Sequence, residues 1–392
     1  MRIKLKQAFD LQMGKTPARN QAENWGGDHR WVSIADIGNA GKYIAKTKEC
    51  ITDAGVNASG IKVVPQGTVI MSFKLSIGKT AITAQDMYTN EAIIAFIDKK
   101  IFEIDPNYLY HLCCGTDWTA GTNKAVMGLT LNKATLLEKE IPLPDICQQR
   151  KIAAKLDKID AIIADRQQQL TMIEQAVKSR FIELFGNPDT NSKGWDECVL
   201  SKKLNVVGGY AFKSDQFNEE RGIPVLRIGN INAGFFRPVN LVYWHEDESL
   251  ERYAMYPGDL VMSLTGTVGK DDYGNVCILG DDYEKYYLNQ RNAKLEITEG
   301  IDKHYLSQLL KFEQIKKRLT GISRGVRQAN ISNKDILNLV VPVPSMEIQH
   351  QFAAFVEQTD KSKYYSQKFL TLCRSAVNIY EQEWMKCQTL IF

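Results

Sequence analysis

Apolar side chains recur at alternating steps of four and three residues through the middle of the chain. This spacing is the heptad pattern of a helix that buries one seam against a second helix. The seam positions, all apolar except for two arginines, are Ile152, Leu156, Ile159, Ile163, Arg166, Leu170, Ile173, Val177, Arg180 and Leu184. The pattern predicts one long helix of about 40 residues, which at about 1.5 Å per residue is a rod of about 60 Å.

Both ends of this expected helix are marked by residues that start or stop helices. Pro142 and Pro144 exclude helix upstream, and Asp145 can cap the first turn, with Gln148 completing a capping-box pattern. At the other end, Phe185-Gly186-Asn187-Pro188 supplies a left-handed cap residue and then a proline that prevents continuation. The helix is therefore expected from about Asp145 to about Phe185.

The same pattern returns 200 residues later, at the C-terminus. Val341-Pro342-Val343-Pro344 repeats Ile141-Pro142-Leu143-Pro144, and the seam returns in the same register. Its positions are Phe352, Val356, Thr359, Lys363, Ser366, Leu370, Cys373, Val377, Tyr380 and Trp384, polar in the middle. Two unrelated surface helices would not share prolines and register at one offset, so we expect two copies of one helix, packed antiparallel.

Short β-rich runs separated by turn residues precede each long helix. Trp31-Val32-Ser33-Ile34, Val63-Val64 and Val225-Leu226-Arg227-Ile228 are examples, and they predict strands. Local matches connect the two regions. Pro65-Gln66-Gly67-Thr68-Val69-Ile70-Met71-Ser72 resembles Pro257-Gly258-Asp259-Leu260-Val261-Met262-Ser263, and Asn90-Glu91 matches Asn289-Gln290.

These repeats predict a tandem duplication of a globular domain followed by a long helix. The expected fold class is α+β: two mixed, strand-rich globular domains separated by two long antiparallel coiled-coil helices, with a pseudo-twofold internal repeat. The expected boundaries are 1–141 for the first domain, 142–187 for the central helix, 188–341 for the second domain and 342–392 for the C-terminal helix.

Composition mainly excludes classes of protein and kinds of site. The 392 residues are too many for one ordinary core. The charged N-terminus lacks the apolar stretch of a signal peptide, and no apolar run is long enough for a membrane span, so we expect a cytoplasmic protein. Eight cysteines form no C-x-x-C pair and the five histidines are scattered, which supports neither a disulfide framework nor a metal site. With a formal net charge of +3, any nucleic-acid surface must be local.

No catalytic constellation is found in the sequence. Gly14-Lys15-Thr16 and Gly78-Lys79-Thr80 resemble the ends of phosphate-binding loops, but Phe9 and Phe73 stand where the required glycine belongs. No Rossmann fingerprint follows a strand, and no nuclease pattern follows Pro144-Asp145. We expect no cofactor and no catalytic residue in this chain.

Polar and basic residues in the expected loops are candidate DNA contacts. Lysines suit phosphates, whereas arginine forks, amides and hydroxyls also suit base edges. A solvated basic helix and turn around residues 311–328 is the alternative to a binding surface. The candidates are Lys15, Arg19, Ser72, Lys74, Lys79, Lys124, Tyr210, Lys213, Arg227, Asn230, Thr265, Thr267, Lys270, Arg324, Arg327 and Gln328.

The sequence resembles the DNA specificity subunits of type I restriction-modification systems. The resemblance covers nearly the whole chain and rests on the string I-P-L-P-x-x-x-Q-x-x-x-I-A-A-x-L-D-x-I-D from Ile141 to Asp160, on Phe185-Gly186-Asn187 and on the two-domain, two-helix repeat. The C-terminal copy departs from this pattern, because Ile348 stands at the counterpart of Gln148.

The resemblance implies that each globular domain is a target-recognition domain for one half of a bipartite, asymmetric site in double-stranded DNA. It implies two methyltransferase subunits along the helices and, in the full enzyme, restriction subunits that translocate DNA. AdoMet, ATP and Mg²⁺ are then expected only on those partners, and no membrane is involved. A protein adaptor that binds two partners without DNA, and an enzyme with an unfamiliar site, are the alternatives.

Overall fold

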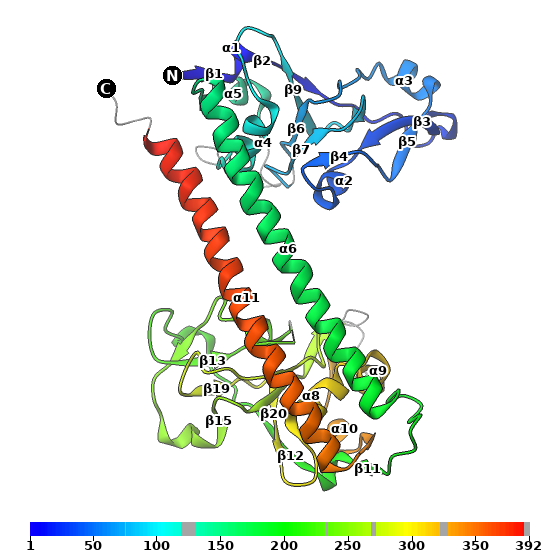
Figure 1. The fold of residues 1–392 in the computed structure, drawn as a ribbon, viewed down its shortest axis with the longest axis vertical. Helices are drawn as coiled ribbons and strands as arrows, with labels where there is room; N and C mark the ends of the chain where they lie inside the picture. The colour runs from blue at the N-terminus through cyan, green and yellow to red at the C-terminus, as the bar shows by residue number, and fades with distance from the viewer. Residues whose placement is uncertain (75, 119–130, 233, 268–271, 322–327, 388–392) are drawn as a thin grey trace. The chain divides into compact units, whose positions relative to one another are not determined.

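The computed structural model describes residues 1–74, 76–118, 131–232, 234–267, 272–321 and 328–387, shown as a ribbon in Figure 1. The chain divides into two compact units, Gln168–Ser366 and the combination of Met1–Gln167 with Gln367–Phe392. We call the globular part of the first unit, residues 1–145, the first head. The globular part of the second unit, residues 186–345, is the second head.

The first head is built on a five-stranded sheet of order β2-β9-β6-β7-β4 and a three-stranded sheet of order β5-β3-β8. The larger sheet contains β2 (Phe9–Met13), β9 (Ile93–Asp98), β6 (Val69–Ser72), β7 (Thr80–Thr83) and β4 (Tyr43–Ile44). The smaller sheet contains β5 (Glu49–Ile51), β3 (Trp25–Val32) and β8 (Tyr88–Thr89), and β1 (Arg2–Lys4) pairs with β10 (Glu140–Pro142). The helices are α1 (Leu5–Ala8), α2 (Ile34–Asn39), α3 (Asp53–Ser59), α4 (Pro106–Gly115) and α5 (Lys133–Leu137).

The second head repeats this plan with a sheet of order β12-β20-β16-β18 and a second sheet of order β14-β13-β19-β15. The first contains β12 (Leu204–Gly208), β20 (Asn292–Ile297), β16 (Leu260–Ser263) and β18 (Val276–Ile278). The second contains β14 (Tyr243–Trp244), β13 (Ile223–Leu226), β19 (Tyr286–Leu288) and β15 (Ala254–Met255). The two-stranded pairs are β11 (Glu197–Val199) with β22 (Val340–Pro342) and β17 (Thr265–Thr267) with β21 (Gln328–Asn330). The helices of this head are α7 (Ile228–Ile231), α8 (Lys303–Leu310), α9 (Glu313–Thr320) and α10 (Asn333–Leu337).

Two of the expected strands end earlier than their composition predicted. Ser33 accepts a hydrogen bond from the Asp36 backbone N–H at 3.3 Å, and Asp36 accepts one from the Ser33 N–H at 2.8 Å. This capping box ends the strand at Val32 and starts α2 at Ile34, the last residue of the expected run. In the second head Asn230 accepts from the Arg227 N–H at 2.9 Å in the same place, ahead of α7. Val64 forms only an isolated bridge, to Met87.

The long helices are α6 (Ile146–Phe185) and α11 (Met346–Cys387). Every predicted seam position of α6 is buried or half-buried, and so is every seam position of α11 from Phe352 to Val377. The side chains of Tyr380 and Trp384 lie outside the described part of the chain. In the second unit the C-terminal half of α6 packs antiparallel on the N-terminal half of α11, with Phe185 and Phe352 ring centroids 5.5 Å apart. The predicted fold class, with its internal repeat, is confirmed.

The ends of α6 follow the predicted signals. Asp145 Oδ1 accepts from the Gln148 N–H at 3.0 Å, as a capping residue does. Gly186 adopts φ of +79° after the last turn, and its N–H donates to the Ile182 carbonyl at 2.8 Å. The domain boundaries at 141/142, 187/188 and 341/342 stay predictions.

One buried glutamine fastens each head to the start of its helix. Gln149, fully buried, donates to the carbonyls of Glu103 and Pro144 at 2.9 and 3.0 Å and accepts from the Asp105 N–H at 2.9 Å. Gln349 has the same role: it donates to the Pro344 carbonyl at 2.8 Å and accepts from the Asp302 N–H at 2.7 Å.

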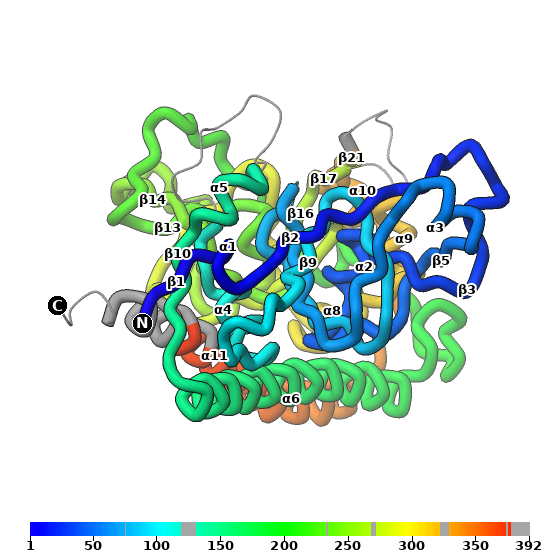
Figure 2. The backbone as a smooth tube through the Cα atoms, turned by 90° about the horizontal axis from the view of Figure 1, so that it is seen from above, coloured from blue at the N-terminus to red at the C-terminus, as the bar shows by residue number. Residues whose placement is uncertain are grey.

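A buried tyrosine adds a second bond at each of these junctions. Tyr108 donates to the Pro142 carbonyl at 2.8 Å, and Tyr305 donates to the Pro342 carbonyl at 2.7 Å. In the first unit α4 also contacts α6, because His111 Nε2 lies 2.7 Å from an Asp157 carboxylate oxygen; Figure 2 shows α4 beside the N-terminal half of α6. The repeated proline string therefore supplies carbonyl acceptors for the head, besides excluding helix.

Candidate nucleic-acid interface

Predicted contact residues of the first head gather at one end of its central sheet. The strand registers pair Met13 with Ile94, Ser72 with Ile93, and Met71 with Thr80. The C-terminal ends of β2 and β6 and the N-terminal ends of β9 and β7 therefore lie at the same end of the sheet. We call this end, where the strands run into loops, the sheet edge. Three of the predicted lysines follow or precede these strand ends, namely Lys15, Lys74 and Lys79. The other end of β2 is the one that leads back through α1 to β1, which pairs with β10 ahead of α6.

The second head gathers its predicted residues at the corresponding edge. Here the registers pair Gly208 with Ala293, Ser263 with Asn292, and Met262 with Val276. Tyr210 follows β12 at this edge, and Thr265 and Thr267 follow β16. The strand that holds both threonines pairs with β21, where Thr267 lies opposite Gln328. Strand pairing thus joins candidates that are about 60 residues apart in sequence, which sequence reasoning did not predict.

A glycine that sequence reasoning missed positions the first loop of each interface. A Cβ atom on Gly14 would lie 2.0 Å from the Thr89 carbonyl oxygen, and one on Gly209 would lie 2.1 Å from the Asn289 carbonyl oxygen. The residue after the glycine is hydrogen-bonded to the same segment, because the Lys15 N–H donates to the Thr89 carbonyl at 2.9 Å. Only glycine permits this close approach of two backbones. Two glycines in matching places would have been the sequence signal.

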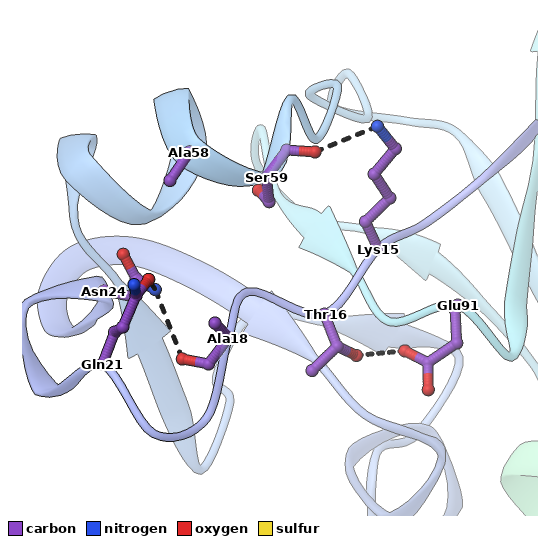
Figure 3. Close-up of a pocket in the computed structure, with 8 residues that line it drawn as sticks. All are labelled: Lys15, Thr16, Ala18, Gln21, Asn24, Ala58, Ser59 and Glu91. Carbon is purple, nitrogen blue, oxygen red and sulfur yellow. Dashed lines mark hydrogen bonds between the residues drawn. The ribbon is translucent and has the colours of Figure 1, made fainter.

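The loop of the first head lines an open pocket of about 590 Å³, shown in Figure 3. Lys15 reaches across it and donates to the carbonyls of Ser59 and Gly60 at 2.9 and 3.2 Å. Thr16 donates from its hydroxyl to a carboxylate oxygen of Glu91, which lies just before β9. The lysine ammonium thus holds the loop against α3. Gln21, Asn24 and Glu91 also line the pocket.

Arg19 forms an ion pair with a carboxylate of the same head. Its guanidinium forms a bidentate pair with Glu49, with N–O distances of 2.6 and 3.1 Å, and lies 3.9 Å from the ring centroid of Trp25. The hydrogen bonds from Arg19 hold the pKa of Glu49 below its ordinary value, and the same bonds raise the pKa of Arg19. An arginine held in this way is pre-oriented, and its charge is balanced locally.

Two predicted contact residues are buried and bonded within their own loops. Ser72, fully buried, donates to the Ser76 carbonyl and accepts from the Lys79 N–H at 3.0 Å. Asn230 donates to the carbonyls of Arg237 and Val239, both at 3.0 Å. A contact from either side chain to DNA would cost these bonds, so their placement favours a role in shaping the loops.

Other predicted residues lie closer to solvent. Lys79, Lys213 and Thr267 are exposed, and Tyr210 is 38% exposed, beside Phe212 at 4.9 Å between ring centroids. Three more candidates are half-buried: Lys74 lies 5.2 Å from the ring centroid of Phe73, Arg227 donates to the Asn240 carbonyl, and Thr265 is on β17.

Five candidates have no described side chain. Lys124, Lys270, Arg324 and Arg327 lie outside the described residues, and Gln328 is described only as the first residue of β21. Their roles as DNA contacts stay predictions.

A basic pocket of about 610 Å³ lies near α9 in the second head. Lys311, Lys316 and Lys317 line it together with Glu313. Lys316, 9% exposed, donates to Asn275 Oδ1 at 2.7 Å, and Lys317 donates to Glu313 at 2.5 Å. The basic stretch noted in the sequence therefore belongs in part to a folded pocket.

Within the described residues, no group of three or more His, Cys, Asp and Glu side chains could hold a metal ion. Over the same part of the chain, no helix is both long and apolar enough to cross a membrane.

Comparison with known proteins gives consistent results along the chain. Residues 1–175 and 193–368 match the family model described as the type I restriction modification DNA specificity domain. The type I restriction enzyme MjaIX specificity subunit of Methanocaldococcus jannaschii is 25% identical over 382 residues, which cover 90% of this chain and 85% of that protein. The type I restriction enzyme EcoBI specificity subunit of Escherichia coli is 22% identical over 338 residues, which cover 75% of this chain and 68% of that protein.

A solved structure has the same fold. The crystal structure of a type I restriction-modification system S subunit from M. genitalium superposes with a TM-score of 0.57 at 15% identity, covering 98% of this chain and 96% of that one.

Proposed function

The chain belongs to the type I restriction-modification DNA specificity family, and from this membership we propose that each head reads one half of a bipartite, asymmetric DNA site. The observation that carries the proposal is the repeated sheet edge. In both heads the same strand ends present loops to one side, whereas the residues on those loops differ, with Lys15 in the first head where the second has Tyr210. A common frame with different loops suits two different half-sites.

We also propose that α6 and α11 fix the spacing between the half-sites and dock methyltransferase subunits. The buried and half-buried seam positions along both helices support a stiff spacer, because side chains of one helix that pack between those of another hold the pair together. Large apolar side chains recur at helical spacing on the surface of α11, with Tyr365 70%, Phe369 40% and Leu372 61% exposed. Apolar groups exposed in this way support an interface with another protein.

The chain itself is proposed to be non-catalytic. AdoMet, ATP and Mg²⁺ are then held by the methyltransferase and restriction subunits. The chain alone is expected neither to methylate nor to cut DNA. Adding the methyltransferase subunits should produce adenine methylation at one bipartite sequence, read by sequencing the modified DNA. Methyl transfer from AdoMet by the isolated chain, or sequence-independent methylation by the complex, would refute the proposal.

The two heads should be separable by mutation. Replacing Arg324, Arg327 and Gln328 with Ala is expected to relax one half-site, at a cost of roughly 1 to 3 kcal/mol for each lost base contact. The measurement is the sequence of the methylated sites. Equal weakening of both half-sites would instead assign these residues to phosphate contacts or to the fold.

A further inference from the structure

One exposed position has the same place in both heads but a different side chain. Asn90 and Asn289 form matching turns, in which the Ile93 N–H donates to the Asn90 carbonyl at 3.1 Å and the Asn292 N–H donates to the Asn289 carbonyl at 2.9 Å. The next residue, Glu91 in the first head, is exposed at the sheet edge that holds the predicted contacts.

The second head has a glutamine at that place. Gln290 is exposed too, and its N–H donates to the Tyr210 carbonyl at 2.8 Å. Both heads thus have an asparagine in the turn, at Asn90 and Asn289, but they differ in the exposed residue that follows it. Glu91 and Gln290 differ by one carboxylate oxygen against one amide nitrogen, so the two heads offer different hydrogen-bonding groups from one position.

An acidic residue at a DNA-facing edge needs a specific explanation, because a carboxylate repels phosphates. One oxygen of Glu91 accepts from Thr16, and Figure 3 shows the other oxygen pointing away from Thr16. Lys15, which lines the same pocket, directs its ammonium to the carbonyls of Ser59 and Gly60.

An ionised carboxylate only accepts hydrogen bonds. The groups of DNA that donate in the major groove are the exocyclic amino groups, N4 of cytosine and N6 of adenine. Resting on the proposed function, we propose that Glu91 determines specificity in the first half-site by accepting a hydrogen bond from such an amino group. Gln290 occupies the matching place for the second half-site, where its amide suits adenine, which offers both a donor and an acceptor.

The test selects sequences from a randomised duplex library with the full chain and its methyltransferase subunits. Glu91→Gln should lower the preference at one base pair of the first half-site by roughly 5- to 150-fold, the range that one good base contact supplies. The second half-site should be unchanged. The preferred base in the wild type distinguishes cytosine from adenine as the amino donor. Gln290→Glu should change one base pair of the second half-site only.

Two variants separate base reading from loop support and from bulk charge. Thr16→Val removes the hydroxyl that bonds Glu91 and keeps the carboxylate, so the selected base should stay the same. Glu140→Gln makes the same charge change at the exposed first residue of β10, beyond the other end of β2, and should leave the selection unchanged. Urea unfolding checks that each variant folds.

The proposal is overturned if Glu91→Gln leaves the first half-site unchanged, or if Thr16→Val or Glu140→Gln reproduces its effect. A preference lost equally at every position would likewise assign Glu91 to the fold. If the wild-type complex selects no bipartite sequence, the proposed function itself fails, and that result is distinct from each of these.

Discussion

Replacing the buried Gln149 tests how the first head is fastened to its helix. Gln149→Met keeps a similar volume and removes three hydrogen bonds, two to the carbonyls of Glu103 and Pro144 and one from the Asp105 N–H. Each bond of this kind contributes about 1 kcal/mol net, so we expect a loss of about 3 kcal/mol in the free energy of unfolding. The residue is fully buried, so water cannot replace the lost partners at no cost.

The matched control is the neighbouring glutamine. Gln148 is exposed, and Gln148→Met should change the unfolding free energy by less than about 0.5 kcal/mol. Urea denaturation followed by far-UV circular dichroism gives the total change. Because α4 and α8 belong to different compact units, amide hydrogen exchange should show lost protection in α4 and none in α8. Equal effects of the two substitutions would refute the reasoning.

Three further substitutions test single features by urea unfolding. His111 has a pKa lowered chiefly by burial, so between that pKa and about 6.5 the unfolded chain binds a proton that the folded chain does not. Stability should therefore fall on acidification through this window, and His111→Gln should flatten the fall. Gly14→Ala would place a Cβ 2.0 Å from the Thr89 carbonyl oxygen and should cost about 1 to 3 kcal/mol. Tyr305→Phe removes the buried hydrogen bond to the Pro342 carbonyl at 2.7 Å and should lower the free energy of unfolding by about 1 to 3 kcal/mol. An unchanged free energy of unfolding would refute the expectation for Gly14→Ala or Tyr305→Phe, and an unchanged pH dependence would refute the one for His111→Gln.

Features set by local sequence were predictable. The heptad seam depends only on the periodicity of one helix, and the cap at Asp145 and the stop at Gly186 depend on neighbouring residues. The duplication was visible because proline strings and seams recur at one offset. The class and repeat of the fold follow from these local signals.

Features set by distant contacts were not predictable. Sequence reasoning chose Gln148 for the first turn, whereas the fully buried glutamine is Gln149, whose acceptors come from the head. Both copies keep that residue, so Ile348 at the counterpart of Gln148 removes nothing from the junction. Likewise, the burial of Ser72 depends on strand pairing that no local pattern encodes.

The most direct test of the central claim changes the length of the long helices. Seven residues inserted into α6 after Arg166 and into α11 after Ser366 preserve the seam and lengthen each helix by about 10 Å. At about 3.4 Å per base pair this corresponds to roughly three base pairs. An insertion of three or four residues should break the seam and disable the protein.

The measurement is the sequence of the sites methylated by the reconstituted complex. The account predicts that both half-sites stay the same and that the spacer between them becomes longer. An unchanged spacer in a folded, active seven-residue variant would contradict the claim that the helices set the distance between half-sites.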